Sequence, residues 1–471
     1  MAAPNSEEPD VTGTNLRLTL AVATLLVAAA AAAQNTGAVI ATDYVSSGSV
    51  ARLQMEAPFA VAADVAAIHN DASGRWHDGL LYVVGRAGAD HIQVLDPDQD
   101  FATVRQFSLG LGRGLRDIAF RDDGTALVSC YDAAELLHVD PQTGAILQII
   151  STAAFADADG LPETGWLLLR DGRLFVTCER LDRDNWYSPV GDSYLLVLDA
   201  ATLTWIDCDA QAPGVQGILL AAPNPYTEIA PTDDGRLLVG CNGYYAVADG
   251  GVDVIDPVTL TSLGLEMGEA ALGGDIVDLA VHGQRRFAVI SDSSFTTRVV
   301  AFGGGVTTVH QGAGYDHADI AVGGDLLYVA DRRLGAAGIR VFDAVSLAEL
   351  TTGPVSCGLP PALVLLPTQT AVPVLDLPGA GLQLAAPWPN PCNPQATVAL
   401  TAPAGAEVTL RVVDMRGRAV RRVGLDVGAD GAATWTFDGR DQAGRALPSG
   451  VYRCVAEGAG GFAARSLTLV R

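Results

Sequence analysis

The sequence predicts an all-β protein: a seven-bladed β-propeller, with six or eight blades as alternatives, followed by a C-terminal immunoglobulin-like (Ig-like) β-sandwich. Two observations carry this expectation. A pattern of four short apolar stretches recurs along most of the chain. The composition combines 49% apolar residues and 52 glycines with only 6% aromatic residues, which suits many short strands joined by tight turns.

The repeat has the pattern of a propeller blade. Each copy begins with an acidic residue before apolar residues, passes a turn centred on Asp-Gly or Gly-Gly, and continues into a run such as LLYVA. A third strand that ends in Asp follows, and then a fourth. Repeats of about 40–55 residues with four strands each are typical of propeller blades. Six copies lie at about residues 61–110, 114–150, 160–208, 215–265, 274–310 and 314–352.

A seventh blade is expected to join the two ends of the repeat region, so that the propeller covers residues 34–368. The segment GAVIATDYVSSGSVARLQM, from Gly37, has the pattern of the middle of a blade. The segment PPALVLLP at 360–367 can supply the first strand of that blade. A shared blade of this kind closes the ring and removes its exposed sheet edges.

The N-terminal region has the pattern of a secretion signal. Leu18 to Gln34 reads LTLAVATLLVAAAAAAQ, an apolar run that ends in small residues. It is too short for a comfortable membrane span but fits the apolar core and cleavage site of a signal peptide. We therefore expect residues 1–33 to be a signal peptide region, the mature protein to have no membrane span, and the protein to be secreted or held at the cell surface.

Charge and cysteine spacing disfavour several classes of function. A formal net charge of -25 argues against nucleic acid and anionic membranes as partners, because both demand a basic face. The seven cysteines include no CxxC pair, which disfavours a zinc site. The sequence has no HExxH, GxSxG or P-loop motif, so no catalytic residue is assigned.

A second domain is expected over residues 387–471, after a linker at 369–386. It opens at Pro387 with PWPNPCNP, which the prolines make stiff and extended. About seven strand-like stretches follow, among them ATVALTAP and EVTLRVVDMRGRAVRRV. That density of strands is typical of a small Ig-like sandwich.

Both domains resemble known families. The phrases LYVVGR…IQVLD, LLYVAD…IRVFD and YLLVLDAATL resemble the YVTN/YncE-like extracytoplasmic β-propellers, which implies a fold more than a function. In the tail, PNPCNP, VTLRVVDMRGRAVRRV, WTFDGRDQAGRALPSGVYRC and SLTLVR resemble the FlgD-like Ig domain and the type A C-terminal sorting domain of the type IX secretion pathway. This second resemblance implies export, with the secretion machinery as a partner.

Acidic residues at the start of the innermost strands form one candidate site. Their repeat positions place them around the central channel of the ring. They either cap the adjoining blade or bind a cation such as Ca²⁺, which takes six to eight oxygen ligands. The residues of this candidate metal site are Asp64, Asp117, Glu228, Asp278 and Asp319.

The long loop from Glu179 to Tyr194 forms a second candidate site, because binding surfaces grow where loops are inserted on one face of a repeat ring. Its acids and asparagine offer oxygen ligands for calcium, and its two aromatic residues offer a stacking platform for a sugar or peptide. An ordered loop without a function is the alternative. The candidate ligand-binding residues are Asp182, Asp184, Asn185, Trp186, Tyr187 and Asp192.

Two cysteines of the tail, Cys392 and Cys454, are candidates for a disulfide in an exported chain, with two unpaired core thiols as the alternative. No cofactor is assigned with certainty, and calcium is the one candidate.

The predicted function is non-catalytic binding of a protein or glycan partner at the cell surface. The alternatives are a propeller enzyme, either a metal-dependent lactonase or esterase or a quinone-dependent dehydrogenase, and a structural subunit of a surface assembly.

Overall fold

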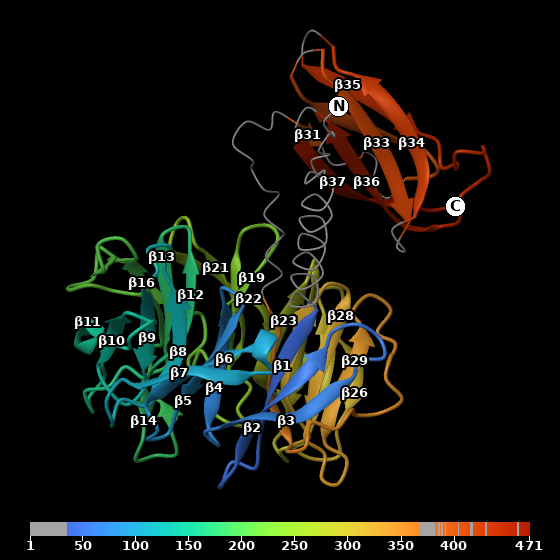
Figure 1. The fold of residues 1–471 in the computed structure, drawn as a ribbon. Helices are drawn as coiled ribbons and strands as arrows, with labels where there is room; N and C mark the ends of the chain where they lie inside the picture. Colours follow the sequence, from blue (N-terminus) through green and yellow to red (C-terminus); the bar gives the residue numbers. More distant parts are fainter. Residues whose placement is uncertain are drawn as a thin grey trace, which may run out of the picture. The chain divides into compact units, whose positions relative to one another are not determined.

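The computed structural model describes residues 35–367, 382–384, 387, 390, 392–403, 405–414, 418–428, 431–458 and 461–471. The chain divides after Thr368 into two compact units (Figure 1). The predicted signal peptide region and most of the predicted linker lie outside the described residues. Within the described part of the chain, no helix is both long and apolar enough to cross a membrane.

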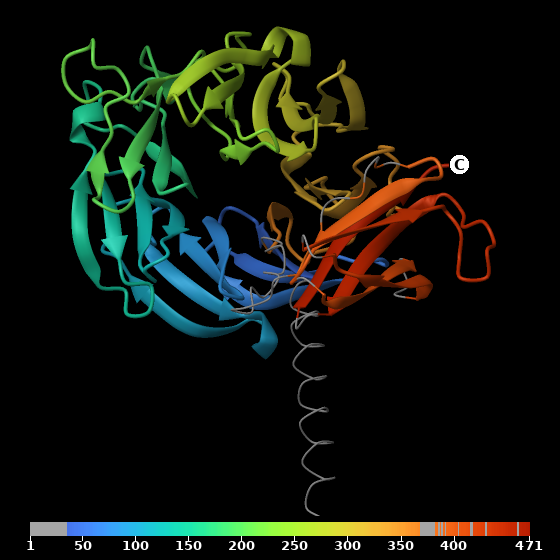
Figure 2. The same ribbon diagram turned by 90° about the horizontal axis from the view of Figure 1, so that it is seen from above.

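The first unit is a β-propeller. Its strands form consecutive antiparallel sheets that are arranged in a ring in the view from above (Figure 2). The first sheet, from its innermost strand outward, is β30 (Pro361–Leu365), β1 (Thr36–Thr42), β2 (Gly48–Gln54) and β3 (Val61–Ile68). The second is β4 (Ala72–His77), β5 (Leu80–Gly85), β6 (His91–Asp96) and β7 (Ala102–Ser108). The third sheet is β8 (Leu115–Phe120), β9 (Ala126–Cys130), β10 (Glu135–Val139) and β11 (Ile146–Ser151).

The remaining sheets of this unit continue the same order, innermost strand first. The fourth is β12 (Thr164–Arg170), β13 (Arg173–Cys178), β16 (Tyr194–Asp199) and β17 (Thr204–Trp205), with β18 (Ile218–Leu219) added to β16. The fifth is β19 (Ala230–Pro231), β20 (Leu237–Cys241), β21 (Gly251–Asp256) and β22 (Thr261–Gly268). The sixth is β23 (Asp275–His282), β24 (Arg285–Ser291), β25 (Thr297–Phe302) and β26 (Thr307–Gln311), and the seventh is β27 (His317–Gly323), β28 (Leu326–Asp331) and β29 (Gly338–Asp343).

The first sheet joins the two ends of the propeller, as predicted. Strand β30 pairs antiparallel with β1, so that Val364 lies opposite Val39 and Leu363 opposite Ile40. The late segment therefore supplies the innermost strand of a sheet whose other strands come from the start of the described chain. The expected shared blade is confirmed.

The prediction for Asp64 was wrong. Strand β3, which carries Asp64, pairs with β2 and is the outermost strand of the first sheet, so this exposed residue lies far from an innermost position. The innermost strand of the second sheet is β4, which begins at Ala72. The pattern of an acid before apolar residues and alanine therefore does not by itself mark an innermost strand.

Three of the other predicted acids link neighbouring sheets. Each lies on an innermost strand and accepts a hydrogen bond from the backbone of the next innermost strand. The donor–acceptor distances are 2.9 Å for Leu167 N–H to Asp117, 2.7 Å for Ile320 N–H to Asp278, and 2.8 Å for Val364 N–H to Asp319. These carboxylates satisfy backbone donors that have no strand partner across the gap between sheets.

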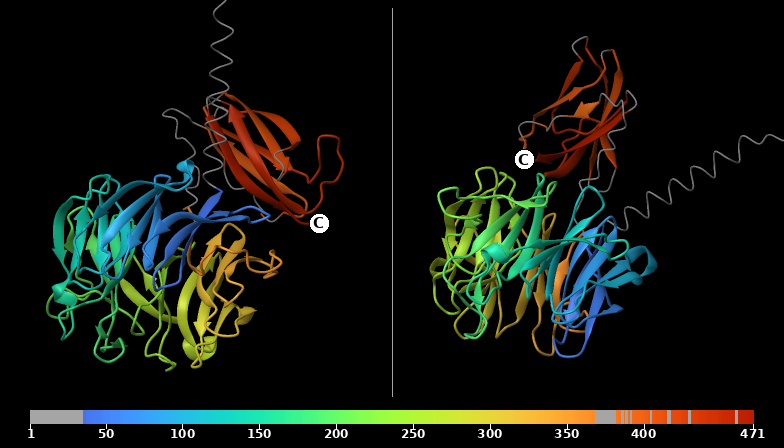
Figure 3. Two further views of the ribbon diagram at one scale, coloured as in Figure 1. Left: turned by 60° about the horizontal axis from the view of Figure 1, so that its bottom comes forward. Right: turned by 90° about the vertical axis from the view of Figure 1, so that its left-hand side faces the viewer.

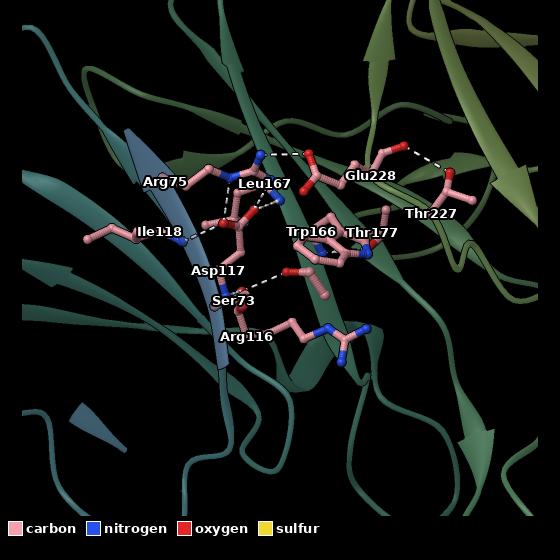
Figure 4. A network of polar contacts seen from close by, with 12 residues as sticks. Ser73, Arg75, Arg116, Asp117, Ile118, Trp166, Leu167, Thr177, Thr227 and Glu228 are labelled. Atoms are coloured by element: carbon pink, nitrogen blue, oxygen red, sulfur yellow. Dashed lines mark hydrogen bonds and ion pairs between the residues drawn. The ribbon is translucent and has the colours of Figure 1, made fainter. Parts of the chain in front are cut away.

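Arg75 replaces an acid at the corresponding place in the second sheet and joins three sheets (Figure 4). Its guanidinium holds both oxygens of Asp117 from the third sheet, at 2.8 and 2.7 Å. It also reaches Glu228, just before the fifth sheet, at 2.6 Å. Burial opposes the charge of Arg75, but the two carboxylates more than offset burial and raise its pKa above the usual value.

Asp278 and Asp319 form a pair of carboxyl groups in the channel wall. Burial raises the pKa of Asp278 to about 7, and the charge of Glu228 adds to this effect. Burial also raises the pKa of Asp319 well above its usual value, and Asp278 adds to it. Two buried carboxyls in direct contact cannot both ionise cheaply, so the pair retains a proton near neutral pH.

The second unit is a two-sheet sandwich, coloured orange and red in Figure 3. One sheet is β31 (Gln383–Leu384), β32 (Ala396–Thr401) and β35 (Ala432–Phe437). The other is β34 (Ala419–Asp426), β33 (Glu407–Asp414), β36 (Gly450–Gly458) and β37 (Gly461–Leu469). Val398 and Phe437 of the first sheet share one buried core with Leu410 and Leu467 of the second, which is the Ig-like arrangement that the sequence predicts.

Cys392 and Cys454 both lie fully buried in this core and are free thiols in the structure. Burial raises the pKa of Cys454 to about 12, and the nearby Cys392 adds to that effect. The two thiols therefore lie close to each other, and the disulfide between them stays a prediction.

We expect Arg75→Met to destabilise the propeller strongly. The substitution leaves Asp117 charged and fully buried without its cation, which costs about 3 kcal/mol or more. Arg52→Met is the matched control, because the Arg52–Asp100 pair has the same 2.8 Å length but is exposed. We expect the control to change the free energy of unfolding by less than about 1 kcal/mol in urea titrations. Equal effects of the two substitutions would contradict the assigned role.

We expect Asp319→Asn to stabilise the propeller at pH 8 and to do so much less at pH 5. Folding raises the carboxyl pKa of Asp278 from 3.8 to about 7. The folded state therefore binds a proton at this pair more tightly than the unfolded state does, so the free energy of unfolding falls as pH rises through that range. Asparagine at 319 can still accept from Val364 N–H and can donate to Asp278. Melting temperatures across pH check this expectation, with the exposed Asp64→Asn as control. Parallel pH profiles for the wild type and Asp319→Asn would contradict it.

Candidate functional site

The channel acids fit the structural alternative of the sequence prediction better than the cation ring. Asp117, Asp278 and Asp319 each accept a backbone hydrogen bond from the adjoining sheet, and Glu228 is paired with Arg75. Across the described residues, no three carboxylate, histidine or cysteine side chains come together in a way that could hold a metal ion.

A pocket with aromatic walls lies among loops of the third to seventh sheets, and we call it the loop-face pocket. Its cavity volume is about 570 Å³, within the range of small-ligand sites. The rings come from several loops that are far apart in the sequence. They are Tyr131, Trp186, Tyr187, Tyr226, Tyr244, Tyr245, Phe295 and Tyr315.

Several of these rings are exposed to an unusual degree. The exposed fraction is 93% for Trp186 and 56% for Phe295, and Tyr187 and Tyr315 are about half exposed. The channel mouth beside the pocket adds Tyr44 and shares Tyr226 and Tyr315 with it. Seven of the 11 tyrosines of the chain therefore lie in this one region. Apolar rings gathered on one face mark an interaction site more often than scattered ones do.

Two buried polar side chains line the pocket and have an acceptor atom without a partner. Glu179 is 2% exposed and Asn224 is 8% exposed. Glu179 Oε2 accepts from the Tyr131 hydroxyl at 3.0 Å, but Glu179 Oε1 and Asn224 Oδ1 accept no hydrogen bond from any described residue. Buried acceptors are satisfied in most native proteins, so a pair of unpartnered ones calls for an explanation.

The charge of Glu179 is only weakly compensated. Burial raises its pKa to about 7, although Arg116 and the Tyr131 hydroxyl act in the opposite direction. Asp275, which also lines the pocket, has a raised pKa because of burial. No arginine or histidine is among the described residues that line the pocket. The site is thus acidic and aromatic.

Contacts between loops hold the walls in place. The hydroxyl of Tyr244, in the loop between β20 and β21, donates to the carbonyl of Pro189, in the loop between β13 and β16, at 2.8 Å. The ring of Tyr245 stacks on Phe295 from the sixth sheet, with 4.6 Å between centroids. These contacts between loops fix the positions of the aromatic walls of the pocket.

The predicted binding loop contributes only part of what was expected of it. It contains a hairpin of β14 (Leu181–Asp182) and β15 (Ser188–Pro189), whose tip places Trp186 and Tyr187 in the pocket wall. The four other predicted residues are exposed and do not line the pocket, and Asp182 instead accepts from the backbone of Asp184 at the hairpin tip. Those four are Asp182, Asp184, Asn185 and Asp192.

Sequence reasoning missed most of the pocket. Asn224, Tyr244, Tyr245 and Phe295 were not singled out, and Glu179 marked only a loop boundary. A signal for the aromatic residues does exist, because aromatics follow the second strand of consecutive repeats as WY, YY and F. No comparable signal marks Asn224, which follows the short strand β18 on an irregular segment.

Comparison with known proteins supports the Ig-like domain. Residues 393–461 match the family model of the FlgD Ig-like domain. No curated protein sequence matches the chain.

Several solved structures match the chain at low identity. PorZ of Porphyromonas gingivalis, described as an essential bacterial surface component of the type-IX secretion system, is 15% identical with a TM-score of 0.43, over 90% of this chain and 63% of its own length. AztD from Citrobacter koseri is 11% identical with a TM-score of 0.42, over 85% of this chain and 98% of its own. The Neurospora crassa Pan2 WD40 domain is 13% identical with a TM-score of 0.42, over 60% of this chain and 78% of its own.

Proposed function

We propose that this protein is a secreted or cell-surface binding protein, and that its propeller holds a group of a protein or glycan partner in the loop-face pocket without catalysis. The observation that carries the proposal is the group of exposed aromatic rings that gathers around this one pocket from several loops. A bound ligand would cover these rings.

The cost of this arrangement supports a binding role. A buried polar atom without a hydrogen bond costs about 1–3 kcal/mol of stability. Trp186, Tyr187 and Phe295 also adopt left-handed backbone angles, with φ of 56°, 56° and 59°. Such angles are unfavourable for bulky residues and gather at functional sites. A protein whose other contacts make it stable can keep such unfavourable features, and a ligand that contacts these loops would offset part of their cost.

Two further features support export. The run from Leu18 to Gln34 has the signal-peptide pattern, and the C-terminal unit has the FlgD-like Ig fold. On this proposal residues 1–33 are removed and the secretion machinery engages the tail, as a sorting domain of the type IX pathway would require.

We expect Trp186→Ala and Tyr187→Ala to weaken ligand binding at least about tenfold, because each removes a large ring from the pocket wall. The experiment is a screen of the full-length secreted protein against glycan and peptide arrays, followed by titration of each hit with the variants. Val258→Ala is the control, since Val258 is 79% exposed and lies outside the pocket. Array hits that bind both aromatic variants as tightly as the wild type would contradict the proposed site. Conversion of a hit to product would favour the enzyme alternative.

Intact-mass and terminal-peptide measurements on protein from cells and medium check the export proposal. We expect the mature chain to begin near Gln34. A chain that ends before about residue 387 would mean that the tail is removed on arrival, whereas one that ends at Arg471 would mean that it is retained. A chain found only inside cells with residues 1–33 intact would contradict export.

A further inference from the structure

We propose that the channel mouth binds a carboxylate group of the ligand through Arg116 and Arg86. This inference rests on the proposed binding function and specifies one group of the ligand, because the mouth adjoins the loop-face pocket and shares Tyr226 and Tyr315 with it. The cavity of the mouth has a volume of about 150 Å³, enough for a carboxylate and a few attached atoms. Three features support the inference: an unpaired cation, a second arginine close to it, and a set of hydroxyl donors around both.

Arg116 is a partly buried cation without an anionic partner. Its guanidinium lies 5.0 Å from the ring centroid of Trp166 and 5.7 Å from that of Tyr131, so aromatic faces hold it in place. Figure 4 shows this guanidinium beside the ring of Trp166. Within the described part of the chain it forms no ion pair, and of its three nitrogens only Nε is shut off from solvent. The two terminal nitrogens are therefore open to a carboxylate, whose two oxygens match the fork of a guanidinium.

Arg86 brings a second positive charge to the same cavity. Its Nε donates to Asp71 at 2.8 Å and its Nη2 donates to the same oxygen, whereas Nη1 has no partner among the described residues. Burial lowers the pKa of Arg86, and the charge of Arg116 lowers it further, although Asp71 acts in the opposite direction. A third arginine, Arg332, lies 4.1 Å from the ring centroid of Tyr44 at the edge of the mouth. Like charges in one cavity repel each other, and an anion that contacts both Arg86 and Arg116 would offset that repulsion.

Three tyrosine hydroxyls add neutral donors around the arginines. Tyr44, Tyr226 and Tyr315 line the mouth, and their hydroxyls form no hydrogen bond with any described residue. Burial raises the pKa of Tyr226 and of Tyr315, so both hydroxyls point into the recess and stay protonated at neutral pH. Arg116 lowers the pKa of Tyr226 by more than Glu179 raises it. The charges around this hydroxyl therefore favour an anion.

The acids of the mouth favour a ligand with one negative charge over a ligand with two. Glu228 is paired with Arg75. Asp278 and Asp319 accept backbone hydrogen bonds and share a proton, so part of their charge remains. A phosphate group carries close to two negative charges at pH 7, whereas a carboxylate carries one. Repulsion from the remaining charge of the wall thus favours a carboxylate over a phosphate.

Glu179 makes this binding depend on pH. Arg116 lowers the pKa of Glu179, but burial raises it to about 7. The other groups that face Glu179 are Arg183 and the Tyr131 hydroxyl, which favour its charged form, and Glu163, which opposes it. Ionised Glu179 competes with a ligand for the charge of Arg116, so we expect a carboxylate to bind more tightly at pH 6, where Glu179 is mostly protonated, than at pH 8. Glu163 and Asp278 also have pKa values of about 7, so a variant is needed to identify the contribution of Glu179.

The test measures binding of five probes to the full-length protein by calorimetry at pH 6. Methyl glucuronide and Nα-acetyl-glutamate methylamide carry a carboxylate, and they distinguish a sugar acid from an acidic amino-acid side chain. Methyl glucoside and Nα-acetyl-glutamine methylamide are their neutral counterparts, and glucose 6-phosphate tests the preference for a carboxylate over a phosphate. We expect at least one acid to bind at least about tenfold more tightly than its neutral counterpart, a difference that one charged contact explains.

Four variants assign this binding to the mouth. Arg116→Gln removes the charge, and we expect it to weaken binding of the acid probe at least about tenfold. Arg116→Lys keeps the charge, and we expect it to weaken binding less. Glu179→Gln should strengthen binding at pH 8 and reduce the gain in affinity between pH 8 and pH 6. Arg236→Gln, at an exposed arginine outside the mouth, is the control. Thermal melting of each variant verifies that it is folded.

The outcomes separate the two proposals. If neither acid binds more tightly than its neutral counterpart, or if Arg116→Gln leaves the affinity of the acid unchanged, the inference of a carboxylate ligand is overturned. Tighter binding of glucose 6-phosphate than of both acids overturns it as well. In each of these cases the proposed binding function still stands when an array hit loses affinity with Trp186→Ala or Tyr187→Ala. If no hit depends on those two rings and neither acid binds, both proposals fail.

Discussion

The propeller depends on one recurring contact, in which a buried carboxylate of one innermost strand accepts a backbone N–H from the next. Sheets in a ring have no strand pairing between them, so packing alone would leave the innermost donors unsatisfied. Asp117, Asp278 and Asp319 solve this problem at three places. Their negative charges accumulate in the channel, and two compensations follow: Arg75 neutralises Asp117 and Glu228, and the Asp278–Asp319 pair keeps a proton.

The loop-face pocket lies beside the channel, but its buried polar groups are less completely paired than the channel acids are. In the channel Asp117 and Glu228 are both paired with Arg75, whereas in the pocket Glu179 and Asn224 each keep an acceptor unpartnered and bulky residues adopt left-handed backbone angles. The two regions meet at Tyr226 and Tyr315, which line both. The bulky residues with left-handed backbone angles therefore lie in loops beside a well-packed channel wall.

Most of the fold could be predicted from the sequence, because strand alternation and turn residues repeat in every blade and the closing strand keeps the same pattern. Asp64 shows the limit: its surroundings match the signature of an innermost strand, but hydrogen bonding to β2 places it at the outer edge. Among the residues that line the pocket, the sequence pointed only to Trp186 and Tyr187, because they lie in a loop that is unusually long. Asn224 and Phe295 come from short, ordinary loops, and only the three-dimensional ring brings them together.

The pairing of β30 with β1 also determines how the propeller would respond to a pulling force. Ala38, near the start of β1, lies opposite Leu365, at the end of β30. The two ends of the propeller therefore leave from the same end of this antiparallel strand pair. Tension between those ends would open the hydrogen bonds of this strand pair one at a time from that edge, rather than load them all at once. The propeller is therefore weakest when force pulls its two ends apart, because that force acts on the strand pair that closes the ring. A tether attached at only one end would not load this strand pair.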